Sequence, residues 1–334
     1  ITQRIMEGFE KLPSYLGVDS LEITAFPGGF SNLTYQVGAG DATYVLRRPP
    51  HGLKIAKAHD MIREFRVLQA LKKAGYTRMP HPISACEDDS IIGAPFFLME
   101  KVEGMIIRNR PPSESTPEFF RSLSQSALDV LIELHSLELS ESGLGALGKP
   151  EGYALRQVQG WAERFQKAKT SEVSNIEESF QWLRASLPAQ SDVAFIHNDF
   201  KYDNLVISTT GEVQAVLDWE MATVGDPLMD LGTTLAYWAE AEDEDILKMF
   251  NLSYVPGNFT RSELIAYYGA KTGRDMSKMN FYYVFGLCKV ATIAQQIYQR
   301  FSLGYSKDPR FSVLNQVVEA AGRMAIKCIQ TGKI

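Results

Sequence analysis

The residues that could carry chemistry are concentrated between positions 195 and 220. His197, Asp199 and Asn204 form the pattern H-x-D-x-x-x-x-N, and Asp218 follows at the end of a later apolar run. Transfer of a phosphoryl group to a hydroxyl needs an acid that orients the hydroxyl and oxygen ligands for the magnesium that neutralises the phosphates. Each residue alone would be an ordinary turn or cap residue, but together they favour phosphoryl transfer.

The elements around these residues predict how they meet. An apolar segment at 193–196 leads into the pattern, and short strands are expected at 205–207 and 213–217 with a Gly-containing turn between them. Such a hairpin would place Asn204 and Asp218 near each other at one end. The spacing of the motif and its structural context therefore agree, as inference from a motif requires.

Two further acids follow the hairpin. Glu220 is a candidate metal ligand or a residue that orients one, and the sequence leaves both alternatives open. Asp226-Pro227 indicates the start of a helix, with Pro at its first position. Asp230 lies one turn inside this helix, where we expect it to accept backbone N–H bonds from the segment around Asp199 and so to support that segment's shape.

The first hundred residues predict a small β-rich lobe. Strands are expected at 21–26, 33–37 and 43–47, and Asp60 is expected to cap a helix that runs to about Lys73. The N-terminal part should therefore consist of a small antiparallel sheet with one helix.

Two adjacent glycines, Gly28 and Gly29, form a tight turn with Ser31 between the first two strands. By themselves they indicate only a hairpin. Beside the phosphoryl-transfer pattern they favour a loop whose main-chain N–H groups and Ser31 contact the phosphates of a nucleotide.

These blocks resemble the aminoglycoside phosphotransferase and choline kinase family of small-molecule kinases, which has a protein-kinase-like fold. The resemblance spans about residues 20 to 300 and rests on three stretches, 197–204 (HNDFKYDN), 217–220 (LDWE) and 225–230 (GDPLMD). More narrowly, the stretches typical of the kinase branch associated with acyl-CoA dehydrogenases are 47–50 (RRPP) and 152–161 (GYALRQVQGW). The resemblance therefore implies a functional link to an acyl-CoA dehydrogenase.

By position, the resemblance implies that Asp199 is catalytic, with Lys201 on the transferred phosphate and His197 in the same loop. It implies ATP and Mg²⁺ as cofactors, with Asn204 and Asp218 holding the metal. The mechanism that follows is in-line transfer of the γ-phosphoryl group, in which Asp199 orients the substrate hydroxyl and accepts its proton.

Arg47 departs from the kinase pattern, because it stands where a lysine would contact the α- and β-phosphates. Arginine keeps the charge and can contact phosphate bidentately, but its shape differs. Arg48 is the alternative, although strand alternation puts it on the opposite face. Glu64, early in the next helix, is expected to pair with Arg47 rather than to lie solvated on an exposed face.

The fold class expected from this resemblance is α+β, a two-lobed protein-kinase-like fold. A nucleotide-binding lobe would comprise residues 1–99, a hinge 100–104, and a mostly helical catalytic and acceptor-binding lobe 105–334. Met99 and Glu100 end an apolar strand at the hinge, where the backbone would bind the adenine edge.

Three polar residues of the helical part receive ordinary interpretations. His135 closes a helix and is expected to be a cap or packing residue. Lys289 and Arg300 could meet an anionic acceptor, but solvated charges are the commoner outcome for such residues.

Composition limits the class of protein further. Of 334 residues, 45% are hydrophobic and 22% charged, which is typical of a globular protein. The net charge of −6 argues against a nucleic-acid partner, and no run reaches the roughly 18 apolar residues of a membrane helix. The first residues do not resemble a signal peptide, and three scattered cysteines predict buried thiols in the cytoplasm.

The branch implies that the small-molecule acceptor is a hydroxyl on an acyl chain, for example in a hydroxyacyl-CoA. The first alternative is a kinase for a polar metabolite, such as an amino alcohol, a sugar or an aminoglycoside. The second is a catalytically silent nucleotide-binding module that regulates a partner. The presence of Asp199, Asn204 and Asp218 argues against the silent module.

Overall fold

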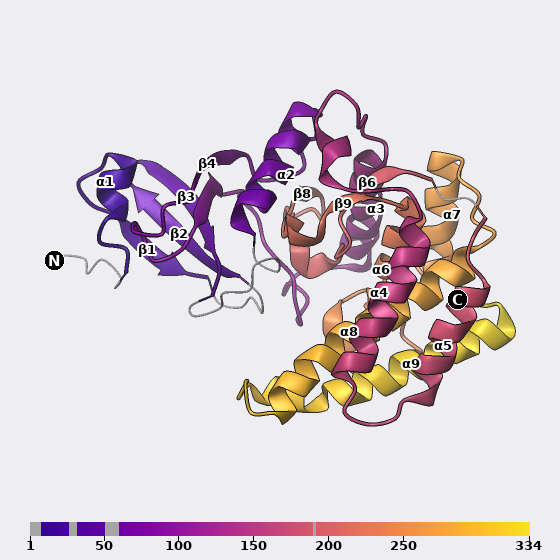
Figure 1. Cartoon of the computed structure of the whole chain (residues 1–334). Coiled ribbons are helices and arrows are strands. Elements are labelled where there is room, and N and C mark those ends of the chain that lie inside the picture. The colour runs from indigo at the N-terminus through magenta and orange to yellow at the C-terminus, as the bar shows by residue number, and fades with distance from the viewer. Residues whose placement is uncertain (1–7, 27–31, 51–59, 190–191) are drawn as a thin grey trace.

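The computed structural model describes residues 8–26, 32–50, 60–189 and 192–334. The chain folds into a small lobe built on a β-sheet and a larger lobe that is mostly helical (Figure 1). This arrangement confirms the expected α+β, two-lobed fold class. The lobe boundaries expected at residues 99 and 105 stay predictions.

The small lobe contains an antiparallel sheet of five strands in the order β1-β2-β3-β5-β4. Its strands are β1 (Glu22–Ala25), β2 (Leu33–Ala39), β3 (Ala42–Arg48), β4 (Pro82–Cys86) and β5 (Phe96–Glu100). The central strand β3 pairs along its whole length with β2 and, on its other edge, with β5. This central position holds the end of β3 firmly in the sheet.

Successive side chains of β3 point to opposite faces of the sheet, as in any strand. Leu46 belongs to the apolar cluster that includes the short helix α1 (Leu12–Leu16), a helix that the sequence did not predict. Val45 belongs to the cluster that includes α2 (Met61–Lys73). Arg47 therefore shares the α2 face of the sheet with Val45.

Helix α2 begins as the sequence predicts. The side chain of Asp60 accepts a hydrogen bond of 2.9 Å from the backbone N–H of Arg63, which confirms the expected N-cap. Leu68 and Leu71 are fully buried on the core side of the helix, and Glu64 is buried on the same side. The helix thus carries a carboxylate into the interior beside the sheet.

Two small antiparallel ribbons belong to the larger lobe. They consist of β6 (Ala194–Ile196) with β9 (Thr223–Gly225) and of β7 (Leu205–Ile207) with β8 (Val213–Val216). Within the second ribbon Leu205 pairs with Val216, and the N–H of Leu217 donates to the carbonyl of Asn204 at 2.8 Å. The expected hairpin is therefore confirmed, and Asn204 and Asp218 lie at the same end of it.

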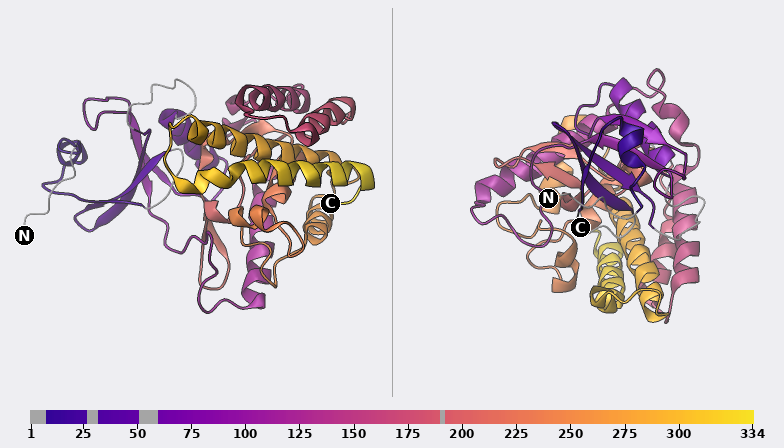
Figure 2. Two further views of the ribbon diagram at one scale, coloured as in Figure 1. Left: turned by 90° about the horizontal axis from the view of Figure 1, so that it is seen from below. Right: turned by 90° about the vertical axis from the view of Figure 1, so that its left-hand side faces the viewer.

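The larger lobe contains α8 (Met279–Ser302), its longest helix, and further α-helices. They are α3 (Pro117–His135), α4 (Tyr153–Ala168), α5 (Ser174–Ala185), α6 (Pro227–Tyr237), α7 (Arg261–Thr272) and α9 (Leu314–Thr331). Helices α8 and α9 run side by side (Figures 1 and 2), and α6 packs against α8. Asp226 caps α6 with Pro227 at its first position, as expected.

Glycines allow α6 and α8 to pack backbone against backbone. A Cβ added to Gly232 would lie 2.2 Å from the carbonyl oxygen of Tyr282, and one added to Gly286 would lie 2.2 Å from that of Gly232. No larger side chain fits such a contact. The two helices are therefore held in one fixed relation.

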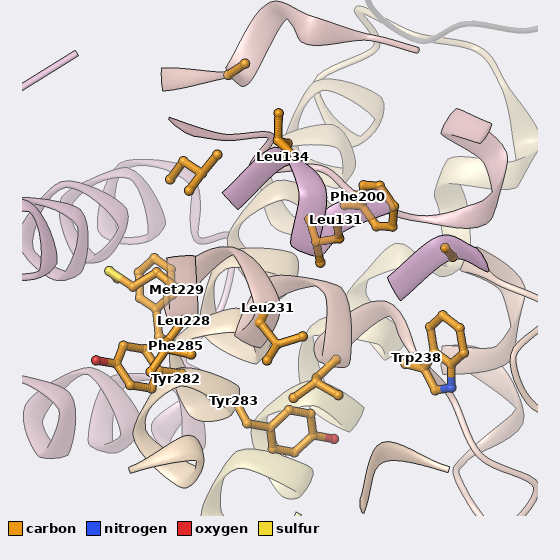
Figure 3. Close-up of a cluster of buried hydrophobic side chains, with 14 of the residues drawn as sticks. Leu131, Leu134, Phe200, Leu228, Met229, Leu231, Trp238, Tyr282, Tyr283 and Phe285 are labelled. Carbon is orange, nitrogen blue, oxygen red and sulfur yellow. The ribbon is translucent and has the colours of Figure 1, made fainter. Parts of the chain in front are cut away.

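The core behind the 197–204 segment includes residues of three helices. Figure 3 shows Phe200, the residue after Asp199, near Leu131 of α3, and Leu228 of α6 beside Tyr282 of α8. Phe200 is 2% exposed, so the segment that carries Asp199 is anchored in the core. The three cysteines are free and buried, as expected. Within the described residues, no helix is both long and apolar enough to cross a membrane.

Candidate active site

The segment that follows β6 is held by an acid from α6. The backbone N–H groups of His197 and Asn198 donate to the two carboxylate oxygens of Asp230, each at 2.7 Å. Asn198 has a φ of 70°, in the left-handed region that few non-glycine residues adopt. A left-handed residue turns neighbouring N–H groups toward one side, where they can bind an anion. Asp230 is that anion.

Asp230 is itself fixed by a buried chain of polar groups. His135 Nε2 lies 3.1 Å from Asp230 Oδ2, and His135 Nδ1 lies 2.8 Å from the hydroxyl of Tyr268. Burial works to raise the pKa of Asp230, but the hydrogen bond and charge of His135 hold the pKa below its ordinary value. His135 was expected to be a cap or packing residue, and the structure instead makes it a polar link, because Asp230 and Tyr268 converge on it.

Asp199 lies at the centre of the contacts. Asn204 Nδ2 donates to the Asp199 carbonyl at 2.9 Å and to its carboxylate at 3.0 Å, and Lys201 Nζ lies 3.2 Å from the same carboxylate oxygen. Burial opposes ionisation, but Lys201, His197 and Lys289 together hold the pKa of Asp199 below its ordinary value. The site thus presents an ionised carboxylate that can accept hydrogen bonds.

Asp218 meets the small lobe through one arginine. Arg47 donates from Nη2 to Asp218 Oδ1 at 2.9 Å, and its Nη1 lies 3.4 Å from Glu64 Oε1. Burial raises the pKa of Glu64 to about 7, although Arg47 acts in the opposite direction. The guanidinium therefore bridges β3, α2 and the hairpin, and two carboxylates share its single charge.

Arg48 lies on the other face of the sheet. It is 2% exposed, and its Nη1 donates to the carbonyl of Ile92 at 2.6 Å. Of the two arginines at the end of β3, Arg47 is thus the one that the structure brings to Asp218.

The sequence and this geometry point to one group of enzymes. The APH phosphotransferase enzyme family matches residues 22–267 of the chain. The chain belongs to this phosphotransferase family.

Several curated relatives of the phosphotransferase are longer proteins. The chain is 34% identical over 328 residues to acyl-CoA dehydrogenase family member 10 of Mus musculus. This match covers 94% of the chain but only 30% of the relative, so the chain spans less than a third of that protein.

Solved structures share the fold. One from Ralstonia eutropha JMP134, whose assignment as an aminoglycoside phosphotransferase is provisional, has a TM-score of 0.78 at 26% identity and covers 95% of this chain and 98% of its own. A thermostable aminoglycoside phosphotransferase variant in ternary complex with AMP-PNP and hygromycin B has a TM-score of 0.62 at 14% identity, with coverage of 96% and 98%. The second likeness shows the fold alone.

The donor set of the phosphotransferase suits a magnesium ion that is shared with phosphates. In the described part of the chain, no three His, Cys, Asp or Glu side chains converge to hold a metal. Asn204 and Asp218 supply two oxygen-bearing groups, and Asn204 uses its amide nitrogen for Asp199, so that its amide oxygen is not used in that contact. Mg²⁺ is commonly held by one or two protein groups with the rest of its shell from phosphates and water, so these residues fit the ion.

Glu220 contacts the end of the glycine-rich segment. Asn32 Nδ2 donates to Glu220 Oε2 at 2.8 Å, while Arg63 of α2 donates to the Glu220 carbonyl at 3.1 Å and to the Ala222 carbonyl at 2.6 Å. Arg63 also reaches the carbonyl of Leu147 at 3.4 Å. Helix α2 of the phosphotransferase is therefore tied to the larger lobe by its first turn.

The structure describes only some of the residues that were expected to bind the nucleotide. Gly28, Gly29 and Ser31 lie outside the described residues. Met99 is buried in β5 and pairs with β3, while Glu100 is exposed and its N–H donates to the His81 carbonyl at 2.9 Å.

Sequence reasoning missed two residues of the site and misjudged a third. The only sign of Arg63 in the sequence was its position beside Glu64. Tyr237 is the last residue of α6, and its ring centre lies 4.8 Å from Lys201 Nζ. Lys289 is 1% exposed, so the expectation of a solvated charge was wrong, because α4, α6 and α9 enclose this part of α8. Arg300, near the end of the same helix, is exposed.

Proposed function

We propose that this phosphotransferase transfers the γ-phosphoryl group of ATP, in line, to the hydroxyl of a small molecule. One observation carries the proposal. The Asp199 carboxylate is ionised and held by Asn204 and Lys201, at the end of a hairpin whose other strand leads to Asp218. An oriented base beside oxygen ligands for a metal is the arrangement that transfer to an alcohol needs.

In this mechanism Asp199 accepts a hydrogen bond from the substrate hydroxyl, orients its oxygen and receives its proton. Lys201, 3.2 Å from Asp199, supplies positive charge where the transferred group gains negative charge. His197 Nε2 donates to the Leu217 carbonyl, 2.9 Å away, and so ties the loop to the strand before Asp218. The protein thus supplies orientation and charge, and no covalent phospho-enzyme is required.

Asn204 and Asp218 would hold Mg²⁺, which supplies neutralisation of the phosphate charge when bound. Arg47 would face the α- and β-phosphates while Glu64 keeps it in place, since Arg47 is paired with both Glu64 and Asp218. Glu220, bonded to Asn32, would orient the groups around the metal.

The nucleotide-binding site would be completed by residues of the small lobe. We assign the phosphate-binding turn to Gly28, Gly29 and Ser31, and the adenine-binding backbone to the segment at Met99 and Glu100. This assignment rests on the sequence pattern and on the position of β5 next to β3 in the sheet.

We propose a hydroxyacyl-CoA as the acceptor, with a functional link to an acyl-CoA dehydrogenase activity. The relative from Mus musculus is named for acyl-CoA dehydrogenases, and the match covers almost the whole chain. Lys201 and Lys289 place positive charge near Asp199, which suits an anionic acceptor better than a polycationic one. Three buried free thiols fit a reducing compartment, and we place the reaction in the cytoplasm.

One observation favours a kinase for an amino alcohol or another polar metabolite. Asp203 Oδ1 is a buried atom that has no hydrogen-bond partner among the residues that the structure describes, and it lies 3.8 Å from Lys201 Nζ. Burial raises the pKa of Asp203 to about 6. An acceptor amine would satisfy this carboxylate.

A screen of ATP consumption tests the proposal. Hydroxyacyl-CoAs, choline-like amino alcohols, sugars and aminoglycosides are compared with and without Mg²⁺, with the Asp199→Asn variant as the blank. Selective turnover of a hydroxyacyl-CoA supports the proposal, and turnover of a polar metabolite alone moves the acceptor to the second candidate. If ATP binds but no acceptor is turned over, the chain is better explained as a silent regulatory module.

A further inference from the structure

Lys289 is the most deeply buried lysine near Asp199. It lies in the middle of α8 with 1% of its surface exposed. No carboxylate among the described residues forms an ion pair with its ammonium group. Burying an ammonium without an ion-pair partner is costly, so its contacts need an explanation.

Among the residues that the structure describes, both hydrogen bonds of Lys289 go to Asn198. Its Nζ donates to the Asn198 carbonyl at 2.6 Å and lies 3.3 Å from Asn198 Oδ1. The carbonyl belongs to the peptide bond that joins Asn198 to Asp199. The ammonium thus holds the peptide plane on which the Asp199 side chain stands.

The backbone N–H and the side chain of Asn198 are hydrogen-bonded as well. Its N–H donates to Asp230 at 2.7 Å, and its side-chain Nδ2 donates to the Met221 carbonyl at 3.1 Å and lies 3.2 Å from the Tyr153 hydroxyl. The left-handed backbone of Asn198, with a φ of 70°, is therefore fixed by several partners at once. Lys289 is the member of this set that fixes the carbonyl.

An alternative role for Lys289 as a direct contact for an anionic acceptor does not fit. Its ammonium is enclosed, lies 5.7 Å from the ring centre of Trp161 in α4, and is already hydrogen-bonded. Reaching a ligand would require it to leave the Asn198 carbonyl unpaired.

We propose that Lys289 is a positioning residue, which holds the left-handed Asn198–Asp199 peptide from behind and so sets the direction of the Asp199 carboxylate. The expected effect on the rate rests on the proposed function. The expected effect on the position of the Asn198–Asp199 peptide rests on the contacts alone. A misplacement of about 1 Å at a reacting group can cost about a hundredfold in rate, so the effect on catalysis is large.

The charge of Lys289 gives the arrangement a pH signature. Burial lowers the pKa of Lys289 to about 8, against the charges of Asp230 on α6 and Asp199 in the loop. Lys201 in the loop and Arg164 on α4 act in the same direction as burial. As the pH rises through about 8, the ammonium loses a proton and its hold on the Asn198 carbonyl weakens.

The test compares Lys289→Met and Lys289→Arg with Gln295→Met. Gln295 is a matched control because it is also a buried donor on α8, and it bonds the Ala168 carbonyl at 3.0 Å instead of the loop. We measure kcat and KM for ATP against pH, thermal unfolding, and hydrogen exchange of the backbone amides of 197–199.

We expect Lys289→Met to lower kcat about 10- to 100-fold with little change in the KM for ATP, and to speed exchange at 197–199. Lys289→Arg should restore much of kcat and move the alkaline loss of activity to higher pH, because arginine stays protonated. Gln295→Met should lower the unfolding temperature without either effect.

Equal kcat and equal exchange in Lys289→Met and Gln295→Met would overturn the inference, whatever their stability. A wild-type chain that turns over no acceptor removes the proposed function but not this test. Hydrogen exchange then decides alone, since faster exchange at 197–199 only in Lys289→Met supports the positioning role and unchanged exchange rejects it.

Discussion

Two groups of charged and polar side chains flank Asp199 and differ in how they are satisfied. The lobe-interface cluster, Arg47, Glu64 and Asp218, pairs side chains of opposite charge. The loop-anchoring cluster, Asp230, His135 and Lys289, bonds mostly to the backbone of 197–198 or within itself.

The first cluster is incomplete and the second is not. Within the described residues, Arg47 Nε and Glu64 Oε2 are buried atoms without a hydrogen-bond partner. Two carboxylates also share one guanidinium. Buried polar groups are normally satisfied, so an exception calls for an explanation such as a ligand. The difference indicates that the interface cluster is built to receive a ligand and the anchoring cluster to hold a shape.

The largest expected effect comes from Asp199, which lies between the two clusters. Asp199→Asn removes the proton acceptor and should lower kcat by about 10² to 10⁴-fold while ATP binding is largely kept. Steady-state kinetics and calorimetric titration with ATP measure the two quantities. Turnover at the wild-type rate would remove Asp199 from the mechanism.

Asp218→Asn tests the interface cluster. It should strongly weaken the Mg²⁺-dependent part of ATP binding, because the ion loses its carboxylate. It should change the unfolding temperature little, because Asn tolerates the left-handed backbone at this position, with a φ of 64°, and its amide oxygen can still accept from Arg47. Titration with ATP at saturating Mg²⁺ checks this. Glu212→Ala, an exposed acid at the other end of the hairpin, is the control. Unchanged nucleotide affinity would contradict the metal assignment.

Asp230→Asn tests the anchoring cluster. It should lower the stability of the fold while leaving the Mg²⁺-dependent part of ATP binding largely unchanged. An amide nitrogen would face a backbone N–H, and each buried group left unsatisfied costs about 1–3 kcal/mol, so the unfolding free energy should fall by about that amount. Denaturant unfolding measures it. A variant as stable as the wild type would erase the contrast between the clusters.

The same variant has a defined pH dependence. The pKa of Asp230 is lowered in the folded state, so its stabilisation is present above the ordinary value of 3.8 and is lost as the pH falls through the lower folded pKa. The difference in unfolding free energy between wild type and Asp230→Asn should therefore shrink in acid. A difference that grows in acid would reverse the assignment.

Arg63→Met should have the smallest effect. It removes the bonds from α2 to the carbonyls of Glu220 and Ala222, which should cost about 1 kcal/mol and raise the KM for ATP modestly, because Glu64 is one residue away. Thermal unfolding and ATP kinetics measure both. Arg66→Met, an exposed arginine one turn later on α2, should change neither.

The sequence was informative where contacts are local. The cap at Asp60, the helix start at Asp226-Pro227 and the hairpin that joins Asn204 to Asp218 were predicted and are confirmed. Each depends on residues close together in the chain, whose types fix the backbone directly. The catalytic, metal and nucleotide roles of the site residues stay predictions.

The errors lie where distant segments meet. His135 was expected to be a cap or packing residue, and it is buried, but its bonds to Asp230 and Tyr268 were not foreseen. Lys289 was expected to be a solvated charge, because a helix in isolation gives no sign of what encloses it. Lys289 contacts a residue 91 positions away, and His135 one 95 positions away. No periodicity in the sequence encodes such a pairing.

The sequence by itself determined which of the site residues stand close together, since Asp199, Asn204 and Asp218 are spaced by one loop and the hairpin that follows it. Only the tertiary structure decided which charges are buried and what they hold. Burial is a property of packing among α4, α6, α8 and the loop, and the cost of burying a charge makes each such group bind a specific partner.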